Sequence, residues 1–285
     1  MAEKDIVEKT LEAYNDVFAD IVNVLLFDGK EIIDENDLVD MATISCYKAD
    51  GKLHEQDRDV SKFWNKSNVH IALLGLENQT DIDKDMPLRI ISYDGAAYRA
   101  QLLDKKNKNR YPVVTLVLYF GNEPWNKHKN LCECFDIPEV LKPFVNDYKL
   151  NLFDIPRLDI ETVRKFKSDF RIVAEYFTQL YQTNDYIPER ETIDHVHEVL
   201  QLLAVFSQDD RFETAFNELQ IREVKNMSEF WDRVESRGIS IGEARAAKRY
   251  EAELKARDVS IAAQAAENAA LKAQIAELLA IQAAR

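Results

Sequence analysis

Three polar residues border two neighbouring strand-like segments, and their types suit hydrolysis of a phosphate ester. Asp59 opens the segment 59–64, and Glu77 and Gln79 close the segment 69–79. Side chains alternate along a strand, so Glu77 and Gln79 project from one face, and a short turn brings Asp59 beside Glu77. Two carboxylates there form an oxygen-rich site for Mg²⁺ (or Mn²⁺), and the third polar group can orient the attacking water. The alternative is a set of solvated acids at strand ends.

Hydrophobic periodicity predicts the elements that position these residues. Apolar residues over 4–27 recur at helical spacing, and a second helix is predicted over 83–103. The segment 69–79 is apolar on both faces for most of its length, as a central strand should be, and 111–120 is a nearly continuous apolar run. Asp50-Gly51 is typical of a hairpin turn. The order helix, strands, helix, strand predicts an α/β module.

The remainder of the chain is predicted to be helical. Segments 161–182 and 189–206 carry apolar residues at helical spacing, and 243–285 is rich in Ala, Glu, Lys and Leu. A heptad pattern runs through this last region, with Leu254, Ile261, Asn268 and Ile275 at one seam position and Arg257, Gln264, Leu271 and Leu278 three residues further on. Such a seam predicts a homodimer through a C-terminal coiled coil, and the alternative is one long helix packed on its own domain.

The predicted organisation is therefore a domain over 1–135, a helical region over 136–240 and a coiled-coil helix over 241–285. Three cysteines do not make a disulfide framework, the first residues have no apolar signal region, and the longest apolar run is far too short to span a bilayer. We therefore expect a cytoplasmic protein with no membrane association. The net charge of −14 repels nucleic acid at long range, so a polyanion must be held by a local basic patch or by bridging cations.

The sequence around the two acids carries a recognisable pattern. Its parts are Arg58-Asp59-Val60, the run Leu74–Thr80, Met86-Pro-Leu-Arg89, Tyr93-Asp-Gly, Tyr98-Arg and the run Tyr111–Gly121. This pattern resembles the Rpn group of recombination-promoting nucleases and putative transposases over about residues 10–130. That group in turn is similar to a branch of the PD-(D/E)xK nuclease superfamily.

The resemblance implies an α-β-β-β-α-β core like that of restriction endonucleases, Mg²⁺ dependence, and endonuclease hydrolysis of DNA during recombination or mobile-element processing. Asp59 then matches the first motif acid, Glu77 the second, and Gln79 the position that is lysine in the basic pattern. The first helix often adds an acid, for which Asp20, and next Asp16, is the expected residue. Glutamine offers only an amide dipole where lysine offers a charge. The alternatives are therefore a catalytically weak DNA-binding protein or an acidic oligomeric scaffold that keeps the fold.

A basic loop is the candidate DNA-binding segment. It lies between the second predicted helix and the strand at 111–120, and it contains four cations and no acid: Lys105, Lys106, Lys108 and Arg110. The segment from Trp125 to Lys129 adds two lysines beside an aromatic ring that can stack on a base. The alternative for both segments is a solvated basic loop.

Overall fold

The structure is a computed structural model that describes residues 11–41, 44–49, 52–57, 59–67, 69–105, 108–188, 190–207, 211–212 and 224–237, with further single positions between 239 and 264. Over 44–49 and 52–57 it describes the backbone alone. The chain divides into two compact units, 1–230 and 231–285. Within the described residues, no helix has both the length and the apolar character needed to cross a membrane.

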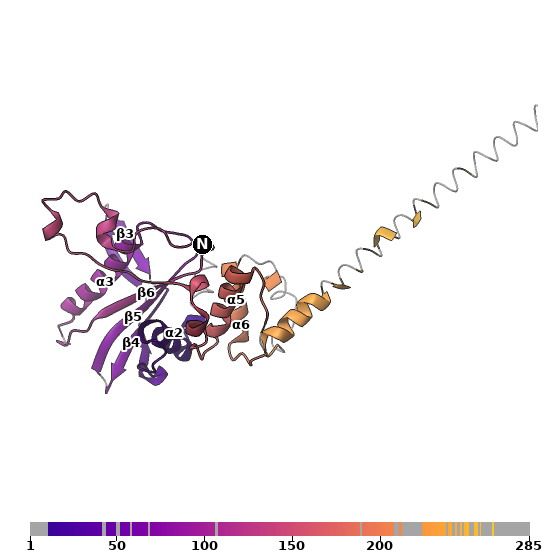
Figure 1. The fold of residues 1–285 in the computed structure, drawn as a ribbon. Helices are drawn as coiled ribbons and strands as arrows, with labels where there is room; N and C mark the ends of the chain where they lie inside the picture. The colour runs from indigo at the N-terminus through magenta and orange to yellow at the C-terminus, as the bar shows by residue number, and fades with distance from the viewer. Residues whose placement is uncertain are drawn as a thin grey trace, which may run out of the picture. The chain divides into compact units, whose positions relative to one another are not determined.

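A five-stranded mixed sheet forms the centre of the first unit (Figure 1). Its order is β1-β4-β5-β6-β7, where β4 is antiparallel to β1 and β5, and β6 is parallel to β5 and β7. The strands are β1 Leu38–Asp40, β4 Val60–Lys66, β5 Val69–Gln79, β6 Val113–Tyr119 and β7 Asn151–Asp154. The predicted strands at 59–64, 69–79 and 111–120 are confirmed as β4, β5 and β6.

A separate two-stranded hairpin precedes β4. Its strands are β2 Ile44–Ala49 and β3 Lys52–Asp57, and Ala49 pairs with Lys52. This pairing agrees with the turn predicted at Asp50-Gly51, although these two residues lie outside the described part of the chain.

Helices cover both faces of the main sheet. On one face, Lys62 of β4 is completely buried and donates from Nζ to the carbonyl of Ala13, just before α2 (Asn15–Phe27). On the other face, α3 (Met86–Leu103) packs Met86, Ile90 and Tyr93 against β6. Along the main sheet the order is therefore helix, three strands, helix, strand, which is the order that the resemblance implies.

The helices after β7 have other bounds than the apolar pattern predicts. The segment 161–182 contains the short α4 (Ile160–Val163) and then α5 (Phe170–Thr183), while α6 (Val196–Ser207) begins seven residues after position 189. The helix is interrupted where the backbone N–H groups of Lys167 and Ser168 donate to Asp20 of α2. A carboxylate on another element thus binds the donors that a continuous helix would use itself.

The sheet extends past residue 135, where the first domain was expected to end. Strand β7 pairs with β6, and Phe120, directly after β6, stacks on Phe206 of α6 with ring centroids 4.6 Å apart. Residues of both expected regions thus pack together, and the unit that contains them runs from 1 to 230. Short 3₁₀ helices complete this unit: η1 Glu35–Asp37, η2 Leu131–Cys134, η3 Lys142–Phe144 and η4 Ile155–Arg157.

Little of the predicted coiled coil is described. Leu254, Arg257 and Gln264 are helical, and Leu254 is 59% exposed, whereas the other five seam residues lie outside the described positions. The homodimer remains a prediction.

Candidate active site

The register of β4 and β5 makes Asp59 and Glu77 neighbours. The register ends with Val60 paired to Leu76, and Asp59 directly precedes β4, so extending the register by one residue would set Asp59 opposite Glu77. Opposite residues of an antiparallel pair point to the same face, with Cβ atoms about 4.5–5.5 Å apart. The carboxylate of Asp59 is also fixed to the strand, because its Oδ2 accepts the backbone N–H of Asn78 at 2.6 Å.

Glu77 is a buried carboxylate that accepts hydrogen bonds from Arg89 and Gln79. Only 2% of the residue is exposed, and its Oε1 accepts from Arg89 Nη2 at 2.5 Å and from Gln79 Nε2 at 3.4 Å. The Arg89 guanidinium also donates from Nη1 to Asp83 Oδ2 at 3.2 Å and from Nη2 to the Tyr93 hydroxyl at 3.4 Å. Glu77 and Gln79 therefore share a face and a hydrogen bond, and Arg89 extends the cluster toward solvent.

The charges of both acids affect the pKa of the Tyr93 hydroxyl, and Glu77 also affects that of Arg89. Burial and the charge of Glu77 raise the pKa of the Tyr93 hydroxyl; Arg89 lowers it, and the charge of Asp59 adds a smaller rise. For Arg89, burial opposes the charged form, but the neighbouring Glu77, Tyr93 and Asp83 outweigh it and raise the pKa of the guanidinium. Both carboxylates therefore act on the Tyr93 hydroxyl, Glu77 more strongly than Asp59.

Helix α3 supplies the cation because of its spacing and its packing. Pro87 lies in its first turn, and Arg89 and Tyr93 are four residues apart, which places them on the same side of the helix. Arg89 is part of the Met86-Pro-Leu-Arg89 run, but nothing in its spacing indicated a contact with Glu77. That contact depends on how α3 docks against the sheet, and sequence reasoning missed it.

The acid that the first helical segment brings to β5 is Glu12, which sequence reasoning also missed. Glu12 is fully buried, and its Oε2 accepts from the side-chain amide of Asn78 at 2.8 Å. Asn78 thus binds Glu12 through its side chain and Asp59 through its backbone. The signal that could have found Glu12 is its place in the predicted helix over 4–27, where it was one of several acids.

Asp20, the expected first-helix acid, is used elsewhere. Its Oδ2 accepts from the backbone N–H groups of Lys167 and Ser168 at 2.8 and 2.7 Å, and from the Ser168 hydroxyl at 2.7 Å. It therefore links α2 to the start of α5 and does not join Asp59 and Glu77. The docking of α2 points this position toward α5, and the assignment of Asp20 to the site stays a prediction without a contact to support it among the described residues.

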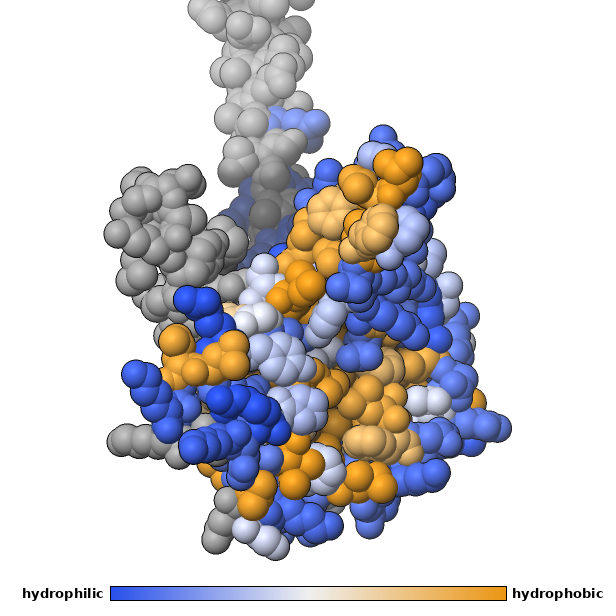
Figure 2. All heavy atoms as spheres, turned by 90° about the vertical axis from the view of Figure 1, so that its left-hand side faces the viewer, coloured by the Kyte–Doolittle hydropathy of each residue, from blue (hydrophilic) through white to orange (hydrophobic). Residues whose placement is uncertain are grey.

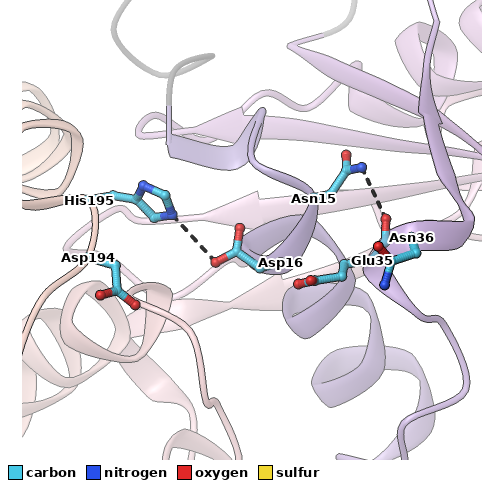
Figure 3. A pocket seen from close by; sticks show the side chains of 6 residues that line it. All are labelled: Asn15, Asp16, Glu35, Asn36, Asp194 and His195. Carbon is cyan, nitrogen blue, oxygen red and sulfur yellow. Dashed lines mark hydrogen bonds and ion pairs between the residues drawn. The ribbon is translucent and has the colours of Figure 1, made fainter.

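Asp16, the second choice, lines a different hollow (Figure 3). This hollow has a volume of about 590 Å³ and is lined by Asn15, Asp16, Glu35, Asn36, Asp194 and His195. Asp16 Oδ2 lies 3.4 Å from His195 Nε2, and the His195 ring stacks on Tyr14 with centroids 3.8 Å apart. Neither Asp59 nor Glu77 lines this hollow.

The predicted basic loop lies at the other end of the sheet. The loop precedes Val113, which pairs with Leu73, whereas Glu77 and Gln79 pair with Val117 and Tyr119 further along β6. Six residues of strand separate these ends by about 20 Å. Lys105, Lys108 and Arg110 are exposed there, and Lys106 lies outside the described residues.

Other cations lie nearer the two acids. Exposed Lys84 follows β5, and its carbonyl is 2.8 Å from Nδ1 of His128, which is flanked by exposed Lys127 and Lys129. Figure 2 shows that hydrophilic (blue) and apolar (orange) surface alternate on the side of the molecule that carries α3, where Leu102 and Leu103 are exposed.

The donor set suits a hard divalent cation held by few protein ligands. Asp59 and Glu77 supply carboxylate oxygens on one face, and Gln79 adds an amide oxygen. No group of three or more His, Cys, Asp or Glu residues that could hold a metal occurs among the described residues. Mg²⁺ commonly takes one or two carboxylates and completes its shell with water and phosphate, so this pair fits such an ion.

The comparisons with known proteins identify one family. A family model described as "Putative transposase, YhgA-like" matches residues 53–212, which is more than half of the chain and includes Asp59, Glu77, Gln79 and Arg89. Comparison with curated proteins and with solved structures finds no match.

Proposed function

The chain belongs to the YhgA-like putative transposase family, and from this membership we propose that it is a metal-dependent DNA endonuclease. The observation that supports the proposal is the hydrogen bond from Asn78 N to Asp59, which holds Asp59 at the end of β5 where Glu77 and Gln79 are hydrogen-bonded to each other. These are the positions that the resemblance to PD-(D/E)xK nucleases assigns to the site. The proposed biological role is DNA recombination or mobile-element processing.

In this proposal Asp59 and Glu77 hold Mg²⁺ or Mn²⁺, and Gln79 orients the attacking water. A divalent cation bound there lowers the pKa of a coordinated water and neutralises charge on the phosphate. The hydrogen bond from Asn78 N holds the Asp59 carboxylate at the residue next to Glu77, which would limit its movement before a ligand arrives. Glu12 takes no direct part, and it supports the site through Asn78.

The chemical step is hydrolysis of a phosphodiester. The water oxygen forms a bond to phosphorus while the bond between phosphorus and the leaving ester oxygen breaks. Water gives up one proton to solvent, and the leaving oxygen takes up one proton, so the products are a phosphate monoester and an alcohol. Gln79 contributes orientation and no proton, because an amide does not titrate in this range.

DNA is the proposed substrate, and the basic loop is proposed to contact its backbone away from the cut. The strand separation of about 20 Å between the acids and the loop equals about six base pairs of B-form DNA. A duplex lying along α3 would pass Arg99, which is exposed, before it reaches Lys105. Such contacts supply local attraction in a chain whose net charge is −14.

One observation favours a second candidate, a DNA-binding protein with weak or absent catalysis. Arg89 holds Oε1 of Glu77 at 2.5 Å, and a guanidinium there competes with a metal ion for the same carboxylate. If that pair does not open, the chain retains the fold and the basic loop but not the hydrolysis.

Nicking of supercoiled plasmid in the presence of Mg²⁺ or Mn²⁺ tests the proposal. We expect Asp59→Asn and Glu77→Gln each to lower the rate by about 100-fold or more, because each removes a charged ligand. Asp136→Asn, which changes an exposed acid outside the site, is the matched control and should nick at the wild-type rate. Equal nicking by wild type and both site variants would reject the site, and DNA binding without metal-dependent cleavage would favour the second candidate.

A further inference from the structure

The charge balance of the candidate site calls for a cation. Asp59, Glu77 and Asp83 are carboxylates, and Gln79 is neutral, whereas a phosphodiester brings a further negative charge that grows during hydrolysis. Positive groups already in place at such a centre are worth far more than the same groups in water. Arg89 is the cation whose contacts with this cluster are described above.

Arg89 lies between the buried acid and the solvent. The side chain of Arg89 is 39% exposed, whereas that of Glu77 is 3% exposed. Nη2 is directed to Glu77 and the Tyr93 hydroxyl, and Nη1 to Asp83, whose side chain is 30% exposed. A guanidinium has five N–H donors in a planar fork, so it can bind a phosphate oxygen while it keeps part of this arrangement. A phosphate that approaches the two acids from solvent therefore meets Arg89.

We propose that Arg89 is a catalytic residue that contacts the scissile phosphate and supplies the positive charge that Gln79 does not. This inference rests on the proposed endonuclease function. Arg89 takes part in no proton transfer: it remains a guanidinium while water attacks phosphorus and the ester bond breaks, and it binds the phosphate oxygens as their charge increases. Its charge-assisted contacts with phosphate strengthen between the bound substrate and the transition state.

The competing explanation is that Arg89 only positions Glu77. The two explanations differ in what they predict for metal binding without catalysis. A phosphate-binding arginine is a like charge beside the metal, so its removal leaves Mn²⁺ affinity unchanged or increases it. A positioning arginine keeps the carboxylate in its binding conformation, so its removal weakens Mn²⁺ binding.

The experiment combines single-turnover cleavage of a labelled DNA duplex at saturating Mn²⁺ with calorimetric titration of Mn²⁺ into the full-length protein without DNA. For Arg89→Ala we expect a rate roughly 100- to 1,000-fold lower and an Mn²⁺ affinity within about threefold of wild type or tighter. Arg89→Lys should retain more activity than Arg89→Ala, because it keeps the charge but loses the fork. Arg164→Ala, which removes an exposed arginine with no assigned role in the site or in the proposed DNA contacts, is the matched control and should cleave at the wild-type rate.

Restoring a cation from the strand side provides an independent test. Gln79 lies on the same face of the sheet as Glu77 and contacts the Glu77 oxygen that Arg89 also contacts. A lysine at position 79 would therefore place a positive charge beside Glu77 from strand β5, in place of the charge that Arg89 supplies from α3. We expect Gln79→Lys combined with Arg89→Ala to cleave about tenfold faster than Arg89→Ala alone, and Gln79→Met in that background to give no gain. If Arg89→Ala does not fold, Arg89→Gln, which retains a donor for Glu77, replaces it in every comparison.

The outcomes separate this inference from the function on which it rests. Wild-type cleavage that Asp59→Asn abolishes, together with an undiminished rate in folded Arg89→Ala, overturns the role of Arg89 and leaves the endonuclease standing. A more than tenfold loss of Mn²⁺ affinity in Arg89→Ala, with the rate recovered at high Mn²⁺, also overturns it in favour of a positioning role. No cleavage by wild type, or none that depends on Asp59, rejects the proposed function itself.

Discussion

The contact between Glu12 and Asn78 makes a sharp prediction for Asn78→Asp. In the native protein the amide of Asn78 donates to a carboxylate oxygen of Glu12 at 2.8 Å, and the two residues are 7% and 0% exposed, respectively. The substitution changes neither size nor shape, but it replaces the donor with a second carboxylate. Two buried carboxylates in contact cannot both be ionised, so one must take up a proton when the chain folds.

The cost follows from the pKa of a carboxylate in the unfolded chain. With a reference pKa of about 4.3 for Glu, protonation on folding costs about 1 kcal/mol at pH 5 and 3–4 kcal/mol at pH 7. The sign is fixed by linkage: a raised pKa means that the folded chain binds more protons than the unfolded chain, so stability decreases as the pH rises. The penalty is therefore absent below about pH 4 and grows by about 1.4 kcal/mol per pH unit until the folded-state pKa is reached.

Urea unfolding followed by circular dichroism at pH 5 and pH 7 measures this effect. Asn78→Ala is the control for the hydrogen bond alone, and it should cost about 1–2 kcal/mol at both pH values. Combining Asn78→Asp with Glu12→Gln restores one donor and one acceptor, so the double variant should recover most of the stability at pH 7. An Asn78→Asp loss that is the same at both pH values, or that Glu12→Gln does not relieve, would show that the described contact does not exist.

Two further predictions concern the parts of the chain outside the site. Changing Lys105, Lys108 and Arg110 together to alanine should weaken duplex binding by about tenfold or more and reduce its salt dependence, because roughly three phosphate contacts are lost. Single-turnover cleavage at saturating protein should stay at the wild-type rate. Unchanged affinity for the duplex in a filter-binding assay would exclude this loop from the DNA interface. Ending the chain at residue 242 should convert a dimer into a monomer in sedimentation velocity, since the heptad seam lies in 243–285, and a truncated chain that remains dimeric would contradict the coiled-coil prediction.

Local patterns predicted the strands and the helix nearest the site. Alternation places Glu77 and Gln79 on one face whatever the rest of the chain does, because it is a property of the extended backbone. The short connection between β4 and β5 fixes their register, which ends at Val60 and Leu76, directly beside Asp59 and Glu77. Apolar periodicity likewise predicted α3 over 83–103, and the structure has it at Met86–Leu103.

Docking of the helices decided what no local pattern contains. Several acids occur in the first predicted helix, and only the rotation of this segment against the sheet decides what each acid contacts. Glu12 binds Asn78, which is 66 positions away in the sequence. Asp20 binds Ser168, which is 148 positions away. The same docking places Arg89 on Glu77 and puts the basic loop at the far end of the sheet. Periodicity specifies which face of an element is apolar, but the rotation and depth at which two faces meet depend on how all their side chains interlock. The sequence thus determined which residues could form a phosphate-hydrolysing site, and the tertiary structure determined which cation and which supporting acid accompany them.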